Sequence, residues 1–150
     1  MLPLGPTHAD HSPYQCLSAH AGNTSLICLE DLAGTGWLST EAARNAPLDD
    51  CLIQAKSGFD ALARPAQKGA FTRFKHTHAF WLDDYSQYQA IRQQQDNRSW
   101  YQWPETLRDW QQASAVRDQY TESIEQVCFE QYLFFSQWSA LHRYAGKRGV

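Results

Sequence analysis

Residues 114–150 read SAVRDQYTESIEQVCFEQYLFFSQWSALHRYAGKRGV and carry the strongest structural pattern in the chain. Apolar side chains recur there at spacings of three and four residues, which bring them onto one face of an α-helix. The pattern predicts a long helix that is buried on more than one side and that Gly146 or Gly149 ends. This stripe consists of Val116, Tyr120, Ile124, Val127, Phe134, Trp138, Leu141 and Ala145, and it is widened by Phe129, Tyr132, Leu133 and Phe135.

The sequence before this helix is also predominantly helical. Apolar residues recur at helical spacing over residues 71–94 and predict a second long helix there. Shorter helices are expected after Ser39, which is a typical N-cap residue, around residues 51–63, and through Leu107 and Trp110. No clean alternation of apolar and polar residues predicts a strand. The chain is therefore expected to be mainly α.

The composition limits the classes of function. The chain has 150 residues, of which 43% are hydrophobic and 13% aromatic, enough for one globular domain. Its formal net charge of -3 argues against binding of nucleic acid through a basic face. No run approaches 18 apolar residues, and the start of the chain lacks the basic and apolar regions of a signal peptide. No membrane span is predicted, and the expected compartment is the cytoplasm.

The first 25 residues are predicted to be a loop, and residues 26–150 a helical region. The stretch MLPLGPTHADHSPYQCLSAHAGN, residues 1–23, holds two Gly, three Pro and three His and has no helical period. Within it, Pro13 fixes its own φ and favours an extended Ser12, which makes a rigid turn before Tyr14. A tyrosine held in this way can stack on a sugar ring and hydrogen-bond to it, or it can pack within the turn.

Two histidine clusters raise the question of a metal site. His8, Asp10 and His11 form one cluster, and His76 with His78 forms the other. Histidines that share a zinc ion on a helix are usually four residues apart, and neither cluster has this spacing. Polar loop histidines are the alternative interpretation. No metal ligand and no cofactor are therefore predicted.

Acidic and thiol groups do not mark a catalytic centre either. Asp83 and Asp84 are adjacent, so on a helix their side chains point about 100° apart and do not share a face. The four cysteines, at positions 16, 28, 51 and 128, contain no C-x-x-C pair and are expected to be reduced and mostly buried. No sequence feature marks one of them as a nucleophile.

Several ordered stretches resemble the 4-alpha-glucanotransferases, also called amylomaltases or disproportionating enzymes. PLGPT at residues 3–7 and SPYQCLSAHAGN at 12–23 are similar to the family's LPLGPT, SPYQ and AGNP motifs. FWLDDYSQY at 80–88 and SWYQWPETLR at 99–108 resemble two further family segments. The stretch that starts with FEQYLFFSQW at Phe129 resembles the family pattern F-x-QY-x-F-x-x-QW. The matches are spread over the whole chain and together are specific to this family.

The resemblance implies a fold and an activity. The family has a (β/α)8 TIM barrel with helical insertions, and this chain is expected to be the helical insertion that follows the first strand, with most barrel strands absent. The enzymes transfer a segment of an α-1,4-glucan to the 4-hydroxyl group of glucose or another glucan, by a retaining mechanism. The implied partners are maltooligosaccharides, starch and glycogen. The implied location is the cytoplasm, without a cofactor.

The catalytic acids of the family have no match in this chain. A retaining enzyme needs two carboxyl groups about 5–5.5 Å apart. The family carries its acids in R-x-DH, AEDLG and HDT stretches, and none of these occurs here; Glu30-Asp31-Leu32 only superficially resembles the second. The chain is therefore expected to be an N-terminal fragment that is inactive alone. Without the barrel, we also expect it to be marginally stable or oligomeric.

The resemblance assigns a binding role to the opening loop. Tyr14 matches a tyrosine that contacts the sugar beside the scissile bond, Ser12, Pro13 and Gln15 shape the loop, and Asn23 anchors it. Two positions depart from the family pattern. Ala9 replaces an aromatic residue linked to a second glucan site in some members, and Thr24 replaces a proline.

Two other classes of function remain as alternatives. The first is a helical module that binds a glucan or a protein without catalysis, using the same aromatic residues. The second is a metal-dependent hydrolase built on the two histidine clusters. The absence of the family's acids is compatible with the first alternative, and the histidine spacing argues against the second.

Overall fold

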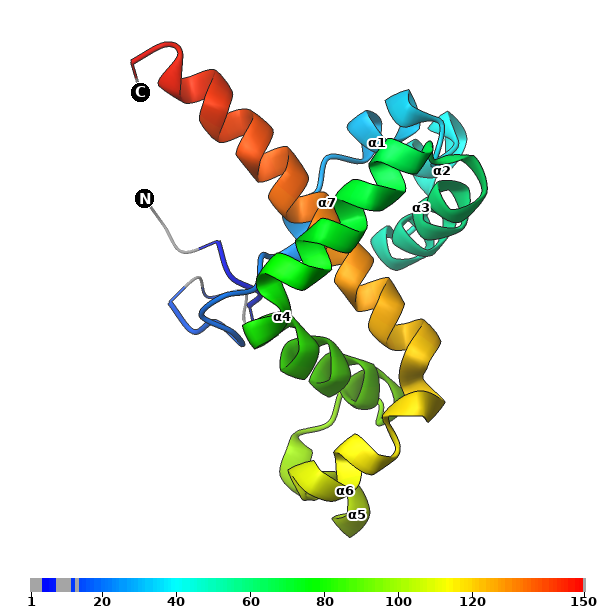
Figure 1. Ribbon diagram of the computed structural model, residues 1–150, viewed down its shortest axis with the longest axis vertical. Helices are drawn as coiled ribbons and strands as arrows, with labels where there is room; N and C mark the ends of the chain where they lie inside the picture. The colour runs from blue at the N-terminus through cyan, green and yellow to red at the C-terminus, as the bar shows by residue number, and fades with distance from the viewer. Residues whose placement is uncertain (1–3, 8–11, 13, 150) are drawn as a thin grey trace.

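The computed structural model describes residues 4–7, 12 and 14–149, and these form an almost wholly helical fold (Figure 1). The helices are α1 (Leu29–Thr35), α2 (Thr40–Asn45), α3 (Leu48–Leu62), α4 (Pro65–Gln94), α5 (Glu105–Arg108), α6 (Trp110–Ala115) and α7 (Thr121–Gly146). Short 3-10 turns lie at η1 (Thr24–Leu26), η2 (Trp100–Gln102) and η3 (Arg117–Tyr120). Within the described ranges no strand forms, and the prediction of a mainly α chain is confirmed.

The two long helices, α4 and α7, organise the molecule. They cross near their middles and make the most extensive contact between any two elements (Figure 1). Helices α1 to α3 pack at one end of this cross, and α5 and α6 at the other. One core follows the crossing and reaches the α5–α6 end, where Tyr88 packs on the buried Trp103 with ring centroids 5.3 Å apart.

Aromatic rings fill the core between α3, α4 and α7. Phe129 of α7 is fully buried, and its ring lies 5.0 Å from that of Phe59 and 5.8 Å from that of Phe71. Trp37, between α1 and α2, meets Phe59 edge-on at 5.0 Å. Such tilted and edge-on contacts are the favoured geometries of aromatic pairs. Most of the aromatic residues predicted on the long helices therefore serve as core.

Helix boundaries follow the local capping groups. Ser39 is confirmed as an N-cap, because its hydroxyl accepts a hydrogen bond from the amide of Ala42. The second long helix begins at Pro65 rather than near residue 71, since proline suits the first helical position and the Gln67 side chain accepts from the Arg64 amide at 2.8 Å. The single helix expected through Leu107 and Trp110 is wrong.

Asp109 divides that expected helix into α5 and α6. Its backbone is extended, with φ of -85° and ψ of 124°, so the helix cannot continue through it. Its carboxylate instead accepts a hydrogen bond from the amide of Gln112 at 3.0 Å. An aspartate that caps the following helix in this way interrupts one helix and starts the next.

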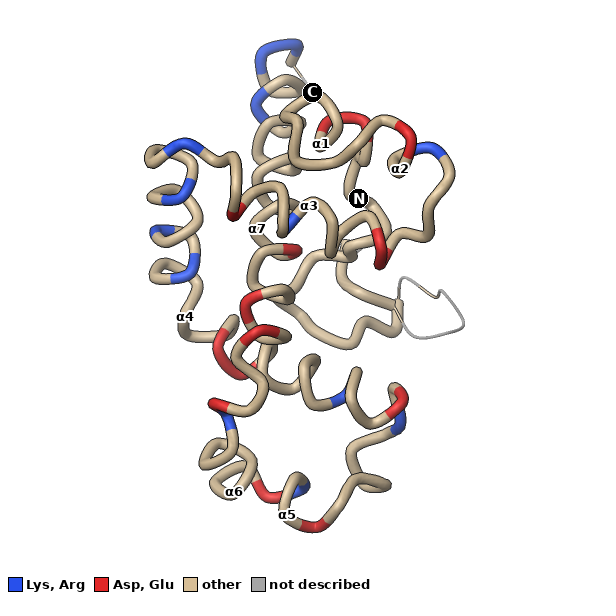
Figure 2. The backbone as a smooth tube through the Cα atoms, turned by 90° about the vertical axis from the view of Figure 1, so that its right-hand side faces the viewer, with Lys and Arg blue, Asp and Glu red and all other residues tan. Residues whose placement is uncertain are grey.

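Four basic residues, Arg64, Lys68, Arg73 and Lys75, lie at the N-cap and in the first half of α4, while Arg92 lies in its last turn (Figure 2). Two of them have acidic or carbonyl partners, since Lys75 forms an ion pair with Glu125 of α7 and the Lys68 ammonium donates to the Asp60 carbonyl oxygen at 2.7 Å. Arg64 and Arg73 are exposed. This short basic segment lies in a chain whose net charge is -3.

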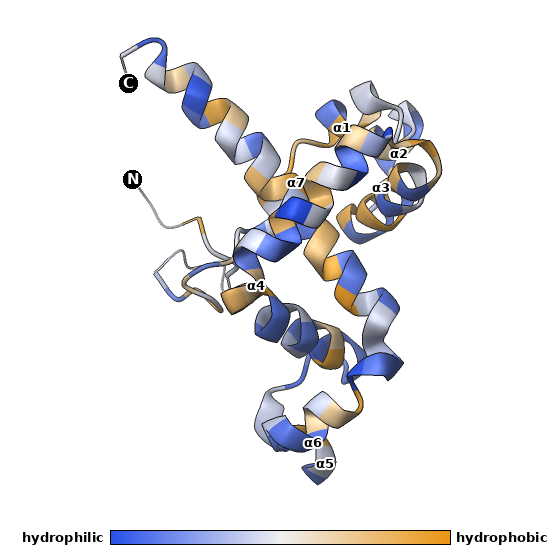
Figure 3. Cartoon of the chain, in the orientation of Figure 1, coloured by the Kyte–Doolittle hydropathy of each residue, from blue (hydrophilic) through white to orange (hydrophobic). Residues whose placement is uncertain are grey.

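The two halves of α7 have different environments. Ile124, Val127 and Phe134 are buried, which confirms the prediction for the first half of the apolar stripe. Beyond them the helix extends away from the other elements, and apolar side chains alternate with polar ones along the free end (Figure 3). Leu141 is 57% exposed there, so the predicted burial on more than one side holds only for the first half of the helix. Helix α7 ends at Gly146.

In the part of the chain that the structure describes, no helix is both long enough and apolar enough to cross a membrane.

Candidate functional site: a loop anchored on α7

The opening loop is a closed turn with a paired stem. Thr7 and Cys16 form an isolated antiparallel bridge, and the Leu17 amide donates to the Pro6 carbonyl oxygen at 2.8 Å. A second stem contact joins the Asn23 amide to the Leu4 carbonyl oxygen, also at 2.8 Å. The loop is therefore held at its base by backbone hydrogen bonds.

The loop presents a tyrosine to solvent close to its stem. Tyr14 is 78% exposed, more than any other large apolar side chain that the structure describes, and Gln15 beside it is exposed as well. The amide of Gln15 donates to the carbonyl oxygen of Ser12 at 3.3 Å, which closes the turn. The alternative of a packed turn tyrosine is therefore wrong. Pro13 and the cluster of His8, Asp10 and His11 lie outside the described residues.

Asn23 closes the loop at its other end. Its side-chain oxygen accepts hydrogen bonds from the Ser25 amide at 3.0 Å and from the Ser25 hydroxyl at 2.8 Å, so it caps η1. Its own amide makes the stem contact to Leu4 described above. Asn23 thus joins the loop to the first helical turn, a geometry compatible with the anchoring role inferred for it.

Two glutamines of α7 hydrogen-bond to the backbone of the segment that follows the loop. The Gly22 amide donates to Oε1 of Gln131 at 2.8 Å, and Nε2 of Gln131 donates to the Gly22 carbonyl oxygen at 3.1 Å. Gln137 makes the same pair of bonds to Cys28, at 2.8 Å and 2.9 Å. One side-chain amide thereby satisfies both backbone groups of one residue, as a neighbouring strand would.

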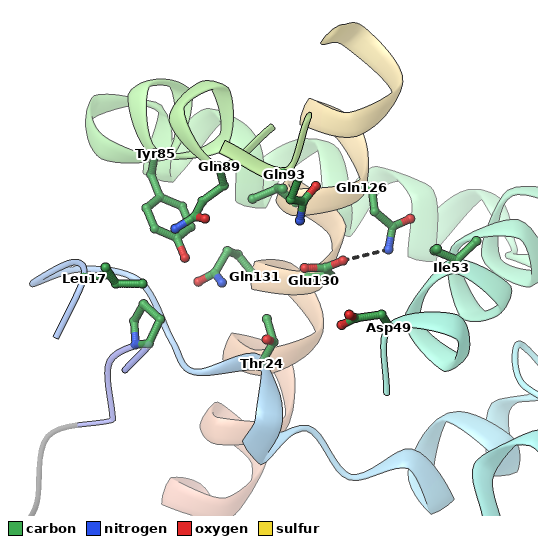
Figure 4. A pocket seen from close by; sticks show the side chains of 12 residues that line it. Leu17, Thr24, Asp49, Ile53, Tyr85, Gln89, Gln93, Gln126, Glu130 and Gln131 are labelled. Carbon is green, nitrogen blue, oxygen red and sulfur yellow. Dashed lines mark hydrogen bonds between the residues drawn. The ribbon is translucent and has the colours of Figure 1, made fainter. Parts of the chain in front are cut away.

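A polar cavity of about 370 Å³ lies behind the loop stem (Figure 4). Loop residues Pro6 and Leu17 form one wall, and polar side chains from three helices converge on the others. The polar lining consists of Thr24 of η1, Asp49 of α3, Tyr85, Gln89 and Gln93 of α4, and Gln126, Glu130 and Gln131 of α7.

Glu130 is the acid of this cavity. Burial of its carboxyl group, with a smaller contribution from the nearby Asp49 carboxylate, raises the pKa of Glu130 from 4.5 to about 7. A hydrogen bond of 2.9 Å from Nε2 of Gln126 acts in the opposite direction, because it favours the charged form. The carboxyl group therefore exchanges its proton near neutral pH. It can donate or accept a hydrogen bond there.

Tyr85 forms the opposite wall. Burial, followed by the negative charge of Glu130, raises the pKa of the Tyr85 hydroxyl to about 12. The hydroxyl therefore stays protonated at neutral pH and serves as a hydrogen-bonding group.

The second histidine cluster does not converge on a metal. His78 packs in an aromatic cluster, stacked on Phe135 with ring centroids 5.6 Å apart, and its Nδ1 accepts from the Trp81 indole at 3.3 Å. Burial lowers the pKa of His78, which favours its neutral form. His76 is exposed. Among the described residues, no group of three or more His, Cys, Asp or Glu side chains is arranged to hold a metal ion.

The cysteines and the adjacent Asp83 and Asp84 do not form a catalytic cluster in the described residues either. Cys51 and Cys128 are buried, and burial raises the pKa of the Cys128 thiol, which disfavours a thiolate nucleophile. Cys28 is exposed, so the prediction of mostly buried thiols holds for only part of the set. Asp83 and Asp84 are both exposed on α4, and Asp83 lies 3.8 Å from the Arg117 guanidinium.

Comparison with known proteins decides the family. The family model described as 4-alpha-glucanotransferase matches residues 1–150, the whole chain. The chain belongs to the 4-alpha-glucanotransferase family. Its relatives include the 4-alpha-glucanotransferases of Thermus thermophilus, 35% identical over 164 residues, and of Aquifex aeolicus (strain VF5), 33% identical over 161 residues. Each of these alignments covers 100% of this chain and 33% of the relative.

A solved member of the family shares the helical arrangement. The amylomaltase from Streptococcus agalactiae, in complex with acarbose, superposes with a TM-score of 0.86 at 27% sequence identity. The superposition covers 99% of this chain and 33% of that one. The resemblance to 4-alpha-glucanotransferases read from the motifs is therefore confirmed in sequence and in structure. The chain spans about a third of the length of the relatives it matches.

The family pattern F-x-QY includes Gln131 but gave it no structural role, and Glu130 of this 4-alpha-glucanotransferase segment falls at its variable position. Glu130 and Gln131 stand in the middle of the apolar run from Val127 to Phe135, and polar residues within such a run are a signal for a buried polar contact. The sequence contains that signal but not the partners. Gly22 lies 109 residues from Gln131, and Asp49 comes from another helix.

Proposed function

We propose that this chain provides the donor-side sugar-binding loop of a 4-alpha-glucanotransferase. The proposed reaction transfers a segment of an α-1,4-glucan to the 4-hydroxyl group of glucose or another glucan, with retention. The observation that carries the proposal is the solvent-exposed Tyr14, in a loop closed by backbone hydrogen bonds and within the family's SPYQ motif. Ser12, Pro13 and Gln15 shape that loop and Asn23 anchors it in this proposal.

Physical chemistry supports a sugar as the ligand of this loop. The face of a pyranose ring carries C–H groups that pack on an aromatic ring, while the phenolic hydroxyl hydrogen-bonds to the sugar's hydroxyl groups. Tyr14 exposes both its ring and its hydroxyl. The proposed ligands are maltooligosaccharides, starch and glycogen. The solved amylomaltase relative holds acarbose, which is consistent with this class.

No catalytic residue is assigned within this chain. The acids of a retaining pair stand about 5–5.5 Å apart, and the family's three acidic motifs do not occur in the sequence. In our proposal, the acids belong to the part of the enzyme that the relatives have in addition to this segment. The proposal also divides the chain into a substrate loop, residues 1–25, and a helical region, residues 26–150. It places the chain as an insertion in a TM barrel, in an enzyme of the cytoplasm.

A chimera tests the proposal. The segment of the Thermus thermophilus enzyme that matches this chain is replaced by the chain, and glucose release from maltotriose is measured. We expect the chimera to be active and the isolated chain to be inactive. Tyr14→Ala in the chimera is expected to lower kcat/KM at least about tenfold, because a stacked aromatic contact is lost.

Tyr101→Ala is the matched control, since Tyr101 is also exposed, at 61%, but lies in η2 beside Trp100. It is expected to leave kcat/KM unchanged. Equal losses in both variants would contradict the role of Tyr14. Turnover by the isolated chain would contradict the absence of catalytic acids. A folded but inactive chimera, together with maltoheptaose binding by the isolated chain, would favour the non-catalytic binding module instead.

A further inference from the structure

The two glutamine contacts of α7 are in register with the segment that leaves the loop. Gln131 and Gln137 are six residues apart, and so are their partners, Gly22 and Cys28. Six residues of α-helix rise about 9 Å. The segment from Gly22 to Cys28 therefore runs parallel to α7 between two bidentate contacts, with η1 between them.

At the inner contact, the side-chain amide of Gln131 cannot hydrogen-bond to solvent water instead of Gly22. Gln131 is only 1% exposed, and both of its amide atoms are used by Gly22. A buried donor or acceptor that loses its partner costs free energy, so the Gly22 backbone has one favoured position on α7. The outer contact joins the half-buried Gln137 to the exposed Cys28 and supports the same register.

This position is transmitted to the loop by the stem. Gly22 precedes Asn23, whose amide bonds to Leu4, and Leu17 on the same side of the stem bonds to Pro6. A shift of Gly22 along α7 would move the base of the loop that carries Tyr14. We propose that Gln131, supported by Gln137, is a positioning residue for glucan recognition, which holds the loop so that Tyr14 meets the sugar in one orientation. The inference rests on the proposed function, in which Tyr14 contacts the glucan.

Gln131→Glu is the most informative variant. The new side chain has the same shape and still accepts from the Gly22 amide, but its carboxylate repels the Gly22 carbonyl oxygen. When protonated, the carboxyl group supplies the missing donor again. We therefore expect the backbone amides of residues 14–23 to exchange hydrogen faster than in the unmodified chain at pH 8, and to regain protection as the pH is lowered.

The pH comparison includes the other titratable groups of the same cavity. Glu130 of α7, Asp49 of α3 and Tyr85 of α4 line it, while the loop contributes no charged group there among its described residues. The unmodified chain, measured over the same pH range, contains all three groups and provides the baseline. Gln119→Glu adds the same charge at an exposed site in η3 and is expected to follow that baseline.

Glucan binding is measured separately, by NMR titration of the 150-residue chain with maltoheptaose. At pH 8, we expect Gln131→Glu to raise Kd about tenfold relative to the unmodified chain, and low pH to restore much of the affinity. If Gln131 had only a structural role, protonation of the new glutamate in Gln131→Glu would not restore both the hydrogen-exchange protection of the loop and the affinity for maltoheptaose. If Gln131→Glu fails to fold by circular dichroism, Gln137→Glu tests the same claim at the half-buried contact, with an expected loss of about threefold.

The outcomes separate this inference from the proposed function. Faster loop exchange with unchanged affinity would overturn the positioning role while the proposed function stands. Unchanged exchange and unchanged affinity in both folded variants would overturn it as well. Absence of maltoheptaose binding in the unmodified chain, with normal loop protection, would count against the proposed function, and the positioning role in recognition would fall with it.

Discussion

The α-carbon of Gly22 faces the ring of Phe134 at the point where the loop leaves the surface of α7. A Cβ atom at Gly22 would lie 1.9 Å from Cδ1 of that ring, much closer than two carbon atoms can approach. Phe134 is itself buried, with only 6% of its surface exposed, so it cannot easily swing away. The absence of a side chain at position 22 is therefore required by the packing of Phe134, whereas the contact with Gln131 uses only the Gly22 backbone atoms.

Gly22→Ala is expected to destabilise the chain by about 1–3 kcal/mol, the usual cost of extra volume in a packed site. Urea unfolding followed by circular dichroism measures this change. Gly34→Ala is the control, because a Cβ at Gly34 in α1 would meet no atom within 4 Å. That variant is expected to be as stable as the unmodified chain or up to about 1 kcal/mol more stable. Equal stabilities for the two variants would contradict the packing argument.

Glu130 makes stability depend on pH in a direction opposite to that of a salt-bridged acid. Because the folded-state pKa of about 7 lies above the ordinary value of 4.5, the folded chain binds more protons than the unfolded one between these pH values. The stabilisation from the protonated form is complete below about pH 4.5 and is lost as the pH rises through about 7. The loss amounts to at most about 3 kcal/mol.

Glu130→Gln keeps an acceptor for Gln126 but removes the titration. We expect this variant to be clearly more stable than the unmodified chain at pH 8 and nearly equal to it at pH 4.5, in urea unfolding at both pH values. Glu122→Gln, at an exposed position of the same helix, serves as the control and should keep the pH dependence of the unmodified chain. A Glu130→Gln variant with that same dependence would refute the assignment.

Phe129 is the centre of the aromatic core. It is fully buried and contacts the rings of Phe59, Phe71 and Tyr132. Phe129→Ala is expected to cost about 3–5 kcal/mol in the free energy of unfolding, or to abolish the cooperative transition. Phe80→Ala removes the same side chain from a site that is 75% exposed and is expected to cost at most about 0.5 kcal/mol. A similar cost at both positions would be inconsistent with this core.

The free end of α7 should promote self-association of the isolated chain. Leu26 and Leu141, each more than half exposed, border an apolar groove of about 420 Å³ that also includes Phe134 and Trp138. Exposed apolar surface of this kind favours association. Sedimentation equilibrium is expected to show a mass that rises with concentration for the unmodified chain, and less so for the Leu26→Ser, Leu141→Ser double variant.

Leu62→Ser provides the control for that experiment, since Leu62 is 65% exposed but lies at the end of α3. It should associate like the unmodified chain. A strictly monomeric unmodified chain with a sharp, concentration-independent unfolding transition would show that the groove does not promote self-association.

Much of the helical framework could be predicted from local patterns. The spacing of apolar residues indicated α4 and the buried half of α7, and Ser39 indicated the start of α2, because these features depend on neighbours a few residues away. The errors have local causes too. Asp109 acted as an N-cap where a continuous helix was expected, and Pro65 started α4 earlier than the apolar pattern suggested.

The candidate site was predictable only in part. The SPYQ motif drew attention to Tyr14, but its exposure followed from the stem pairs of Leu17 with Pro6 and Asn23 with Leu4. The raised pKa of Glu130 depends on burial and on Asp49, which approaches from α3. No spacing rule connects residues on different helices, because their distance is set by how the helices cross.

By itself, the sequence determined that this chain is helical, that a loop precedes its first helix, and that it belongs with the 4-alpha-glucanotransferases. These properties follow from the short-range spacing of apolar residues and from the order of the family motifs along the chain. Only the tertiary structure decided that Gln131 holds Gly22, 109 residues away, and that Phe134 leaves room for nothing larger there. The physical reason is that buried amide groups take whichever partner the packed helices bring within reach, and the crossing of α4 and α7 sets that partner.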